Sequence, residues 1–89
     1  MTKPTHNPHL KAAYLEVVDN QLRDNDPPET RQTLARLKEK GYSEQDAKIL
    51  IASAVVAETY WILKKSEPFN RDRFLRNLQR LPNQEFDEP

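Results

Sequence analysis

The chain has 89 residues, with 14 basic and 14 acidic side chains, a formal net charge of zero, one glycine and no cysteine. This length suits one small domain, and without cysteine the chain has no disulfide, no thiolate metal ligand and no cysteine nucleophile. The neutral charge argues against a dedicated nucleic-acid-binding domain, because such domains normally carry a positive excess.

Residues 1–6 are expected to form a disordered arm, and residues 7–82 a single helical domain. The first helix is predicted over residues 8–24. Asn7 is a good N-cap, and Pro8 suits the first helical position because the N–H that it lacks would have no partner there. Helical spacing places five apolar residues on one face of this helix: Leu10, Tyr14, Val17, Val18 and Leu22.

A second helix is predicted from the sequence Asp26-Pro27-Pro28-Glu29. In this interpretation Asp26 is the N-cap, Pro27 takes the first helical position and Glu29 reaches back in a capping box. The helix should stop at Lys40, since Gly41 readily adopts the left-handed conformation that ends helices. Its short apolar stripe is formed mainly by Leu34 and Leu37.

The third helix is predicted from Glu44 to about Lys65, with Ser43 as its N-cap and Tyr42 packing on Ala47. Within residues 49–63 only Ser53, Glu58 and Thr59 are polar. A helix that is apolar nearly all round should be central and buried. This run is too short to cross a membrane and contains Glu58, so no membrane association is expected.

Pro68 interrupts the chain, and Asn70 is predicted to cap a fourth helix with Phe69 and Phe74 in contact across its start. Its inner face should contain Phe74, Leu75, Leu78 and Leu81. Pro82 should end it, and residues 83–89 should form a disordered acidic tail. Short connections favour antiparallel neighbours, so we expect an all-α, compact four-helix bundle around the long apolar third helix.

Glu58 is the first candidate for a functional site, because the residues three and four positions away are all apolar: Ala54, Val55, Trp61 and Ile62. A carboxylate in such surroundings either handles a ligand, metal or proton, or is a structural partner for an arginine, a tyrosine or a backbone N–H. We favour the structural role. Trp61 and Tyr60 are the accompanying pocket candidates, although a tryptophan on a central helix usually belongs to the core.

Arg73, Arg76 and Arg80 are spaced at i, i+3 and i+7 and form a predicted basic face on the fourth helix. Such a face can meet phosphates or an acidic protein surface, but it is more often simply solvated. His6 and His9 are the only histidines, and without nearby carboxylates or thiolates they make a poor metal site. No catalytic constellation is visible, so we expect neither an enzyme nor a cofactor nor a bound metal.

Several short segments, taken in order, resemble a family of small uncharacterised bacterial proteins, a domain of unknown function. The resemblance covers about residues 7–82, and its segments are Asn7-Pro8-His9-Leu10, Val17-Val18-Asp19-Asn20-Gln21-Leu22, Asp26-Pro27-Pro28-Glu29, Gly41-Tyr42, Ala57-Glu58, Glu67-Pro68-Phe69 and Leu81-Pro82. It implies an all-helical bacterial domain without an established activity.

The resemblance also implies that many members carry His-x-x-x-His pairs in the first helix and early in the third helix, near the glutamate that Glu58 matches. The corresponding positions are Lys11 and Leu15, and Gln45 and Ile49. Because none of these residues is a histidine, a metal function of such relatives is not transferred to this chain.

The leading functional hypothesis is a protein–protein interaction module that self-associates, because the apolar third helix exceeds what three short helices can cover. The alternatives are nucleic-acid binding through Arg73, Arg76 and Arg80, and a small-ligand or metal pocket around Glu58. The expected partner is a protein or a second copy of the chain rather than nucleic acid or a membrane. Met1–Leu10 is too polar for a signal peptide, so a cytoplasmic location is expected.

Overall fold

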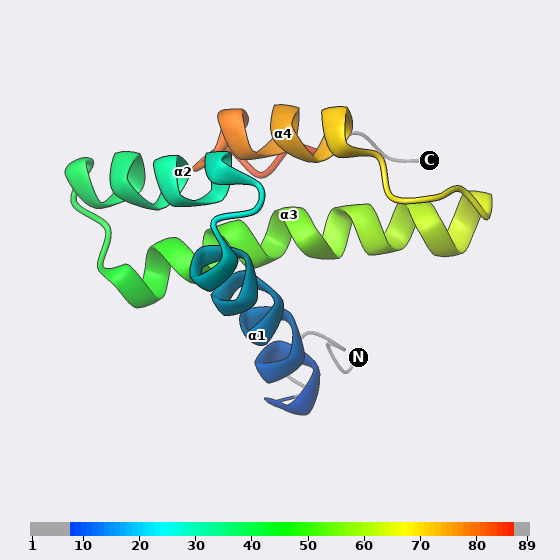
Figure 1. Ribbon diagram of the computed structural model, residues 1–89, viewed down its shortest axis with the longest axis horizontal. Coiled ribbons are helices and arrows are strands. Elements are labelled where there is room, and N and C mark those ends of the chain that lie inside the picture. Colours follow the sequence, from blue (N-terminus) through cyan, green and yellow to red (C-terminus); the bar gives the residue numbers. More distant parts are fainter. Residues whose placement is uncertain (1–7, 87–89) are drawn as a thin grey trace.

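The computed structural model describes residues 8–86, and it describes the side chains from Leu10 onward. Four helices follow one another: α1 (Pro8–Asp24), α2 (Pro28–Glu39), α3 (Glu44–Lys65) and α4 (Arg71–Arg80). The central helix is α3, which contacts each of the other three. α2 and α4 lie along one side of α3, whereas α1 crosses α3 and projects from its other side (Figure 1). The predicted all-α four-helix bundle is confirmed.

Three of the predicted helix ends are confirmed by their hydrogen bonds. Ser43 Oγ accepts a hydrogen bond from the backbone N–H of Asp46 at 3.0 Å, and the side chain of Asn70 accepts one from the N–H of Arg73 at 3.0 Å. At the end of α2, Gly41 has a φ of 105°, and the N–H groups of Gly41 and Tyr42 bond to the carbonyls of Lys38 and Leu37. This pattern is a Schellman motif, which requires the positive φ that glycine tolerates best.

The predicted start of α2 is wrong by one residue. The N-cap is Pro27, with φ −76° and ψ 151°, and no side chain caps the helix. The physical reason is Pro28, because a residue that precedes a proline is disfavoured in the helical region and is pushed into an extended conformation. Asp26 and Glu29 therefore form no capping box, and both carboxylates lie near the Arg71 guanidinium, at 3.6 and 3.7 Å.

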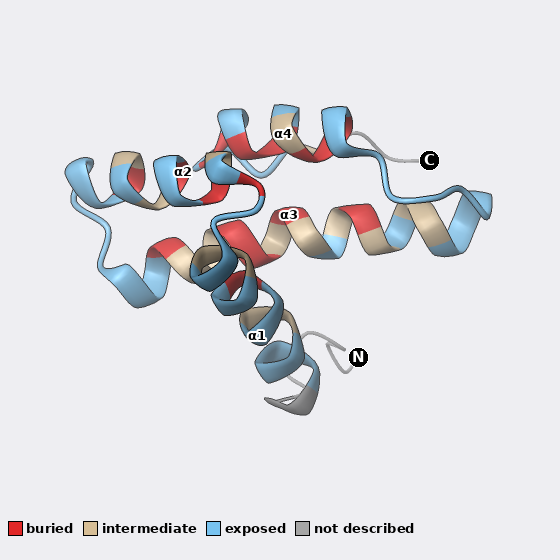
Figure 2. Cartoon of the chain, in the orientation of Figure 1, coloured by how far each residue is buried: buried red, intermediate tan, exposed pale blue. Residues whose placement is uncertain are grey.

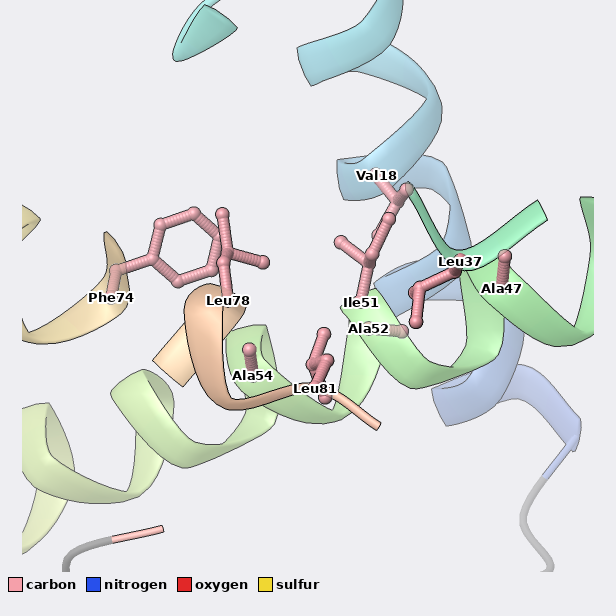
Figure 3. Close-up of a cluster of buried hydrophobic side chains, with 9 residues drawn as sticks. All are labelled: Val18, Leu37, Ala47, Ile51, Ala52, Ala54, Phe74, Leu78 and Leu81. Atoms are coloured by element: carbon pink, nitrogen blue, oxygen red, sulfur yellow. The ribbon is translucent and has the colours of Figure 1, made fainter. Parts of the chain in front are cut away.

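The core lies between the helices and is built largely of small and medium side chains (Figure 3). Phe74 and Leu78 of α4, with Leu81 just after it, pack toward α3, and Phe69 stacks at a tilt on Phe74 with 5.6 Å between ring centroids, as predicted. Phe86 also packs against this core, so the predicted tail is not free of contacts over residues 83–86. The buried apolar residues are Val18, Leu37, Ala47, Ile51, Ala52, Ala54, Phe74, Leu78 and Leu81.

The C-terminal end of α4 is held by a side chain from α2. Arg36 donates one hydrogen bond to the carbonyl oxygen of Leu81 at 2.7 Å and another to that of Leu78 at 2.8 Å. The last carbonyls of a helix have no partner within the helix, so a guanidinium with two donors satisfies them efficiently. The ends of α2 and α4 are therefore joined directly.

Two predictions about apolar faces are wrong in part. Leu10 and Val17 were placed on the buried face of α1 but are exposed, because Leu15, Val18 and Leu22 turn toward the core instead. Likewise α3 is central but not buried all round, since α1, α2 and α4 leave one of its sides uncovered (Figure 2). Over residues 8–86, none of the helices combines the length and the apolar character required to traverse a bilayer.

Candidate functional site

The uncovered side of α3 carries a row of apolar residues, which we call the outer face of α3: Ile49, Val56, Tyr60 and Leu63. Ile49, Val56 and Leu63 are each seven residues apart, which is close to two helical turns and places them on one side. Val56 is 43% exposed, Tyr60 49% and Leu63 75%, while Ile49 is half-buried. An apolar surface therefore follows most of the length of the longest helix.

The outer face of α3 also lacks charge. Glu58 is the only charged residue between Ile49 and Leu63, and it points to the opposite side of the helix, where it is 1% exposed. Solvent-facing sides of helices in globular domains are normally charged or polar. The outer face of α3 thus differs from an ordinary solvated helix surface.

Glu58 lies between α3 and the start of α4, where it forms a buried ion pair with Arg73. Its Oε2 accepts a hydrogen bond from Arg73 Nε, and its Oε1 accepts one from Arg73 Nη2 at 3.1 Å. The same Oε1 accepts a third hydrogen bond from the backbone N–H of Asn70 at 3.0 Å. Both carboxylate oxygens are therefore occupied by donors of this chain.

Arg73 is 7% exposed and has further contacts around its guanidinium. Nη1 lies 3.4 Å from Glu67 Oε1, and the guanidinium carbon lies 4.3 Å from the centre of the Trp61 ring. The hydrogen bonds to Glu58 raise the pKa of Arg73 above its ordinary value. A carboxylate held by an arginine that stays charged suits a structural link between α3 and α4 better than proton transfer.

The three pocket candidates do not converge on a cavity. Glu58 is buried against α4, the half-buried Trp61 packs over Arg73, and the exposed Tyr60 belongs to the outer face of α3. Two shallow hollows on the surface are lined by residues 67–72 and by residues 40–42 with Pro82, and neither includes these three side chains. Glu58 accepts hydrogen bonds from an arginine and from a backbone N–H, which are two of the three structural partners that the sequence analysis named.

The predicted basic face of α4 requires a correction, because Arg73 does not belong to it. The buried side of α4 is formed by Arg73, Phe74, Asn77 and Leu78. It therefore includes two polar residues beside the apolar ones. Arg76 and Arg80 are exposed, and Arg80 Nη1 donates to the carbonyl oxygen of Glu85 at 3.1 Å. The basic face is reduced from three arginines to two.

The histidines fall where the structure gives no information, since His6 and the side chain of His9 lie outside the described residues. Among the side chains that the structure does describe, no cluster of three or more acidic, histidine or cysteine residues is arranged to hold a metal ion.

Sequence reasoning expected part of the apolar third helix to stay uncovered but did not identify which residues would be exposed. The seven-residue spacing of Ile49, Val56 and Leu63, which places them on a single side of the helix, could have identified them. It anticipated the side-chain cap of Asn70 but not the hydrogen bond from the Asn70 backbone to Glu58.

A scan against models of protein families, a search of curated proteins and a search of solved structures each found no match. The resemblance to a family of small bacterial proteins stays a prediction.

Proposed function

We propose that this chain is a small helical protein–protein interaction module that binds its partner through the outer face of α3. The observation that carries the proposal is the uncharged apolar row of Ile49, Val56, Tyr60 and Leu63 on the uncovered side of the central helix. Contiguous exposed apolar surface on a small domain is typical of protein interaction sites.

Packing of the four helices does not require apolar residues on the outer face of α3. The core of the domain is formed by the other side of α3, through residues such as Ile51 and Ala54, which are fully buried. Charged residues on the outer face would increase solubility and leave those core contacts intact. Binding of a partner would remove the exposed apolar side chains from water, at about 25 cal/mol for each Å² buried.

The two alternative functions receive less support. Nucleic-acid binding through α4 loses one of its three arginines to the buried pair with Glu58. A ligand or metal site at Glu58 would require breaking that pair, since both carboxylate oxygens already accept hydrogen bonds.

Site-specific photo-crosslinking in cells of the native host tests the interaction. A photo-reactive phenylalanine analogue replaces Val56 in one variant and, as a matched control, the exposed Ala35 on α2 in another. We expect covalent protein adducts from position 56, none from position 35, and loss of the adducts when Leu63→Glu is added. Equal labelling at both positions, or no adduct at either, would refute the proposal.

A further inference from the structure

The charges at the two ends of α3 indicate what covers its outer face. We propose that the occupant is a second copy of this chain, and that the two α3 helices pack antiparallel around a two-fold axis beside residue 55. The inference rests on the proposed function and names its partner. It is carried by Asp46 and Lys64, which flank the outer face of α3 at opposite ends.

Asp46 and Lys64 are exposed and form no ion pair with other residues of the described chain. The charged residues close to Asp46 differ in this respect, because Glu44 pairs with Lys38 at 3.2 Å and with Lys48 at 3.5 Å. The intrachain ion pairs at the start of α3 therefore leave the Asp46 carboxylate available to a partner.

The two charges lie on the same side of the helix. They are 18 residues apart, which equals five turns of 3.6 residues. Lys64 Nζ lies 5.6 Å from the centre of the Tyr60 ring, which places the ammonium group at the edge of the outer face. The outer face is thus an uncharged apolar row with an anion at one end and a cation at the other.

Such a row is complementary to itself in one orientation only. In an antiparallel pair, Asp46 of each copy meets Lys64 of the other, and the helix dipoles are opposed. A parallel pair would place both Asp46 carboxylates at one end of the interface and both Lys64 ammonium groups at the other, so neither charge would meet an opposite one. Residue 55 is the midpoint of the two charged positions, so the two Val56 side chains meet near the axis.

The size of the surface predicts a reversible dimer. From Asp46 to Lys64 the helix rises about 27 Å, and a helix surface about 10 Å wide gives on the order of 300 Å² for each copy. Stable interfaces bury about 800 Å² for each partner, so we expect dissociation in the micromolar range or weaker. The segments beyond the described residues, 1–7 and 87–89, include only Met1 as a large apolar side chain, which makes them poor alternative occupants.

Charge reversal tests both the partner and the orientation. The full-length chain and its variants are measured by sedimentation velocity at low salt, from about 10 µM to about 1 mM. Asp46→Lys and Lys64→Asp each turn two attractive contacts into repulsive ones, so each alone should weaken dimerisation by about tenfold. An equimolar mixture of the two variants should dimerise like wild type, because every contact between them is again between opposite charges.

Three controls accompany the experiment. Glu39→Lys changes an exposed charge on α2 and should leave dimerisation unchanged. Val56→Glu places a charge near the axis and should abolish dimerisation. Far-ultraviolet circular dichroism melts verify that each variant is folded.

The outcomes separate this inference from the proposed function. A wild-type chain that stays monomeric at about 1 mM overturns self-pairing, and adducts to a different protein at position 56 would then retain the interaction module with another partner. Dimers that Val56→Glu abolishes but the charge reversals do not affect overturn the antiparallel arrangement. The inference is supported only if each charge reversal weakens dimerisation and the equimolar mixture of the two variants restores it.

Discussion

Replacing Glu58 with glutamine removes one charge from the α3–α4 link and changes the side-chain volume very little. Glu58 is 1% exposed and Arg73 7%, so the variant leaves the guanidinium buried without its main counter-charge. The glutamine amide still offers one acceptor oxygen, but its NH₂ group faces the donors of Arg73. The substitution therefore tests whether this ion pair is desolvated, as its burial indicates.

The size of the effect follows from the contacts that remain. Removing one partner of a buried ion pair destabilises proteins by about 3–5 kcal/mol. Arg73 keeps the 3.4 Å contact with Glu67 and its position over Trp61, so we expect the lower end, about 3 kcal/mol. For a chain of 89 residues the total free energy of unfolding is on the order of 4–13 kcal/mol. A loss of this size should lower Tm by roughly 12–24 °C.

Urea unfolding measured by circular dichroism and by the fluorescence of Trp61, the only tryptophan, provides the assay. Two controls calibrate the result. Glu67→Gln removes only the long outer contact and should change the free energy of unfolding by under about 1 kcal/mol. The double variant Glu58→Leu/Arg73→Met removes both charges and should recover most of the loss. If Glu58→Gln unfolds within about 0.5 kcal/mol of wild type, the pair is not desolvated and the reasoning is wrong.

Two further predictions concern the helix starts and the response to pH. Asn70→Ala and Ser43→Ala should each lower the free energy of unfolding by about 1 kcal/mol in urea titrations, since each removes the acceptor for one N–H at a helix start; no change in either would contradict the observed caps. Hydrogen bonding from Lys38, together with the charge of Lys48, lowers the pKa of Glu44. Its stabilising contribution is therefore present above the unfolded-state pKa of about 4.3 and is lost as the pH falls through the lower folded-state pKa. Glu44→Gln should make the stability curve flatter below about pH 5, and an unchanged acid slope in thermal melts would show that Glu44 contributes nothing.

Local sequence signals predicted the helices well because the physics of helix ends is local. Ser43, Asn70 and Gly41 each act on hydrogen bonds within a few residues, and all three work as their residue types indicate. The start of α2 is the exception, although aspartate is one of the residues most favoured as an N-cap. Asp26 does not cap the helix because Pro28 holds Pro27 in an extended conformation, which moves the helix start by one residue.

The candidate sites depended on contacts between helices, which spacing within one helix does not determine. The apolar neighbours of Glu58 indicated that it needed a partner, but the identity of that partner follows from how α4 is placed against α3. The same placement makes Arg73 a buried residue, although its spacing with Arg76 and Arg80 is that of a solvated stripe. The sequence also did not identify Val56 and Leu63 as the exposed residues of α3, because the side of an apolar helix that stays uncovered depends on where the neighbouring helices pack.

The contact of Arg36 with the end of α4 has a consequence for how the molecule opens. The last turn of a helix usually frays, and it exchanges amide hydrogens through small local fluctuations. Here the carbonyls of Leu78 and Leu81 are bonded to a residue more than forty positions earlier, so unwinding this turn also breaks the contact with α2. The last turn of α4 and the last turn of α2 therefore belong to one cooperative unit, in which slow amide exchange at one is linked to slow amide exchange at the other.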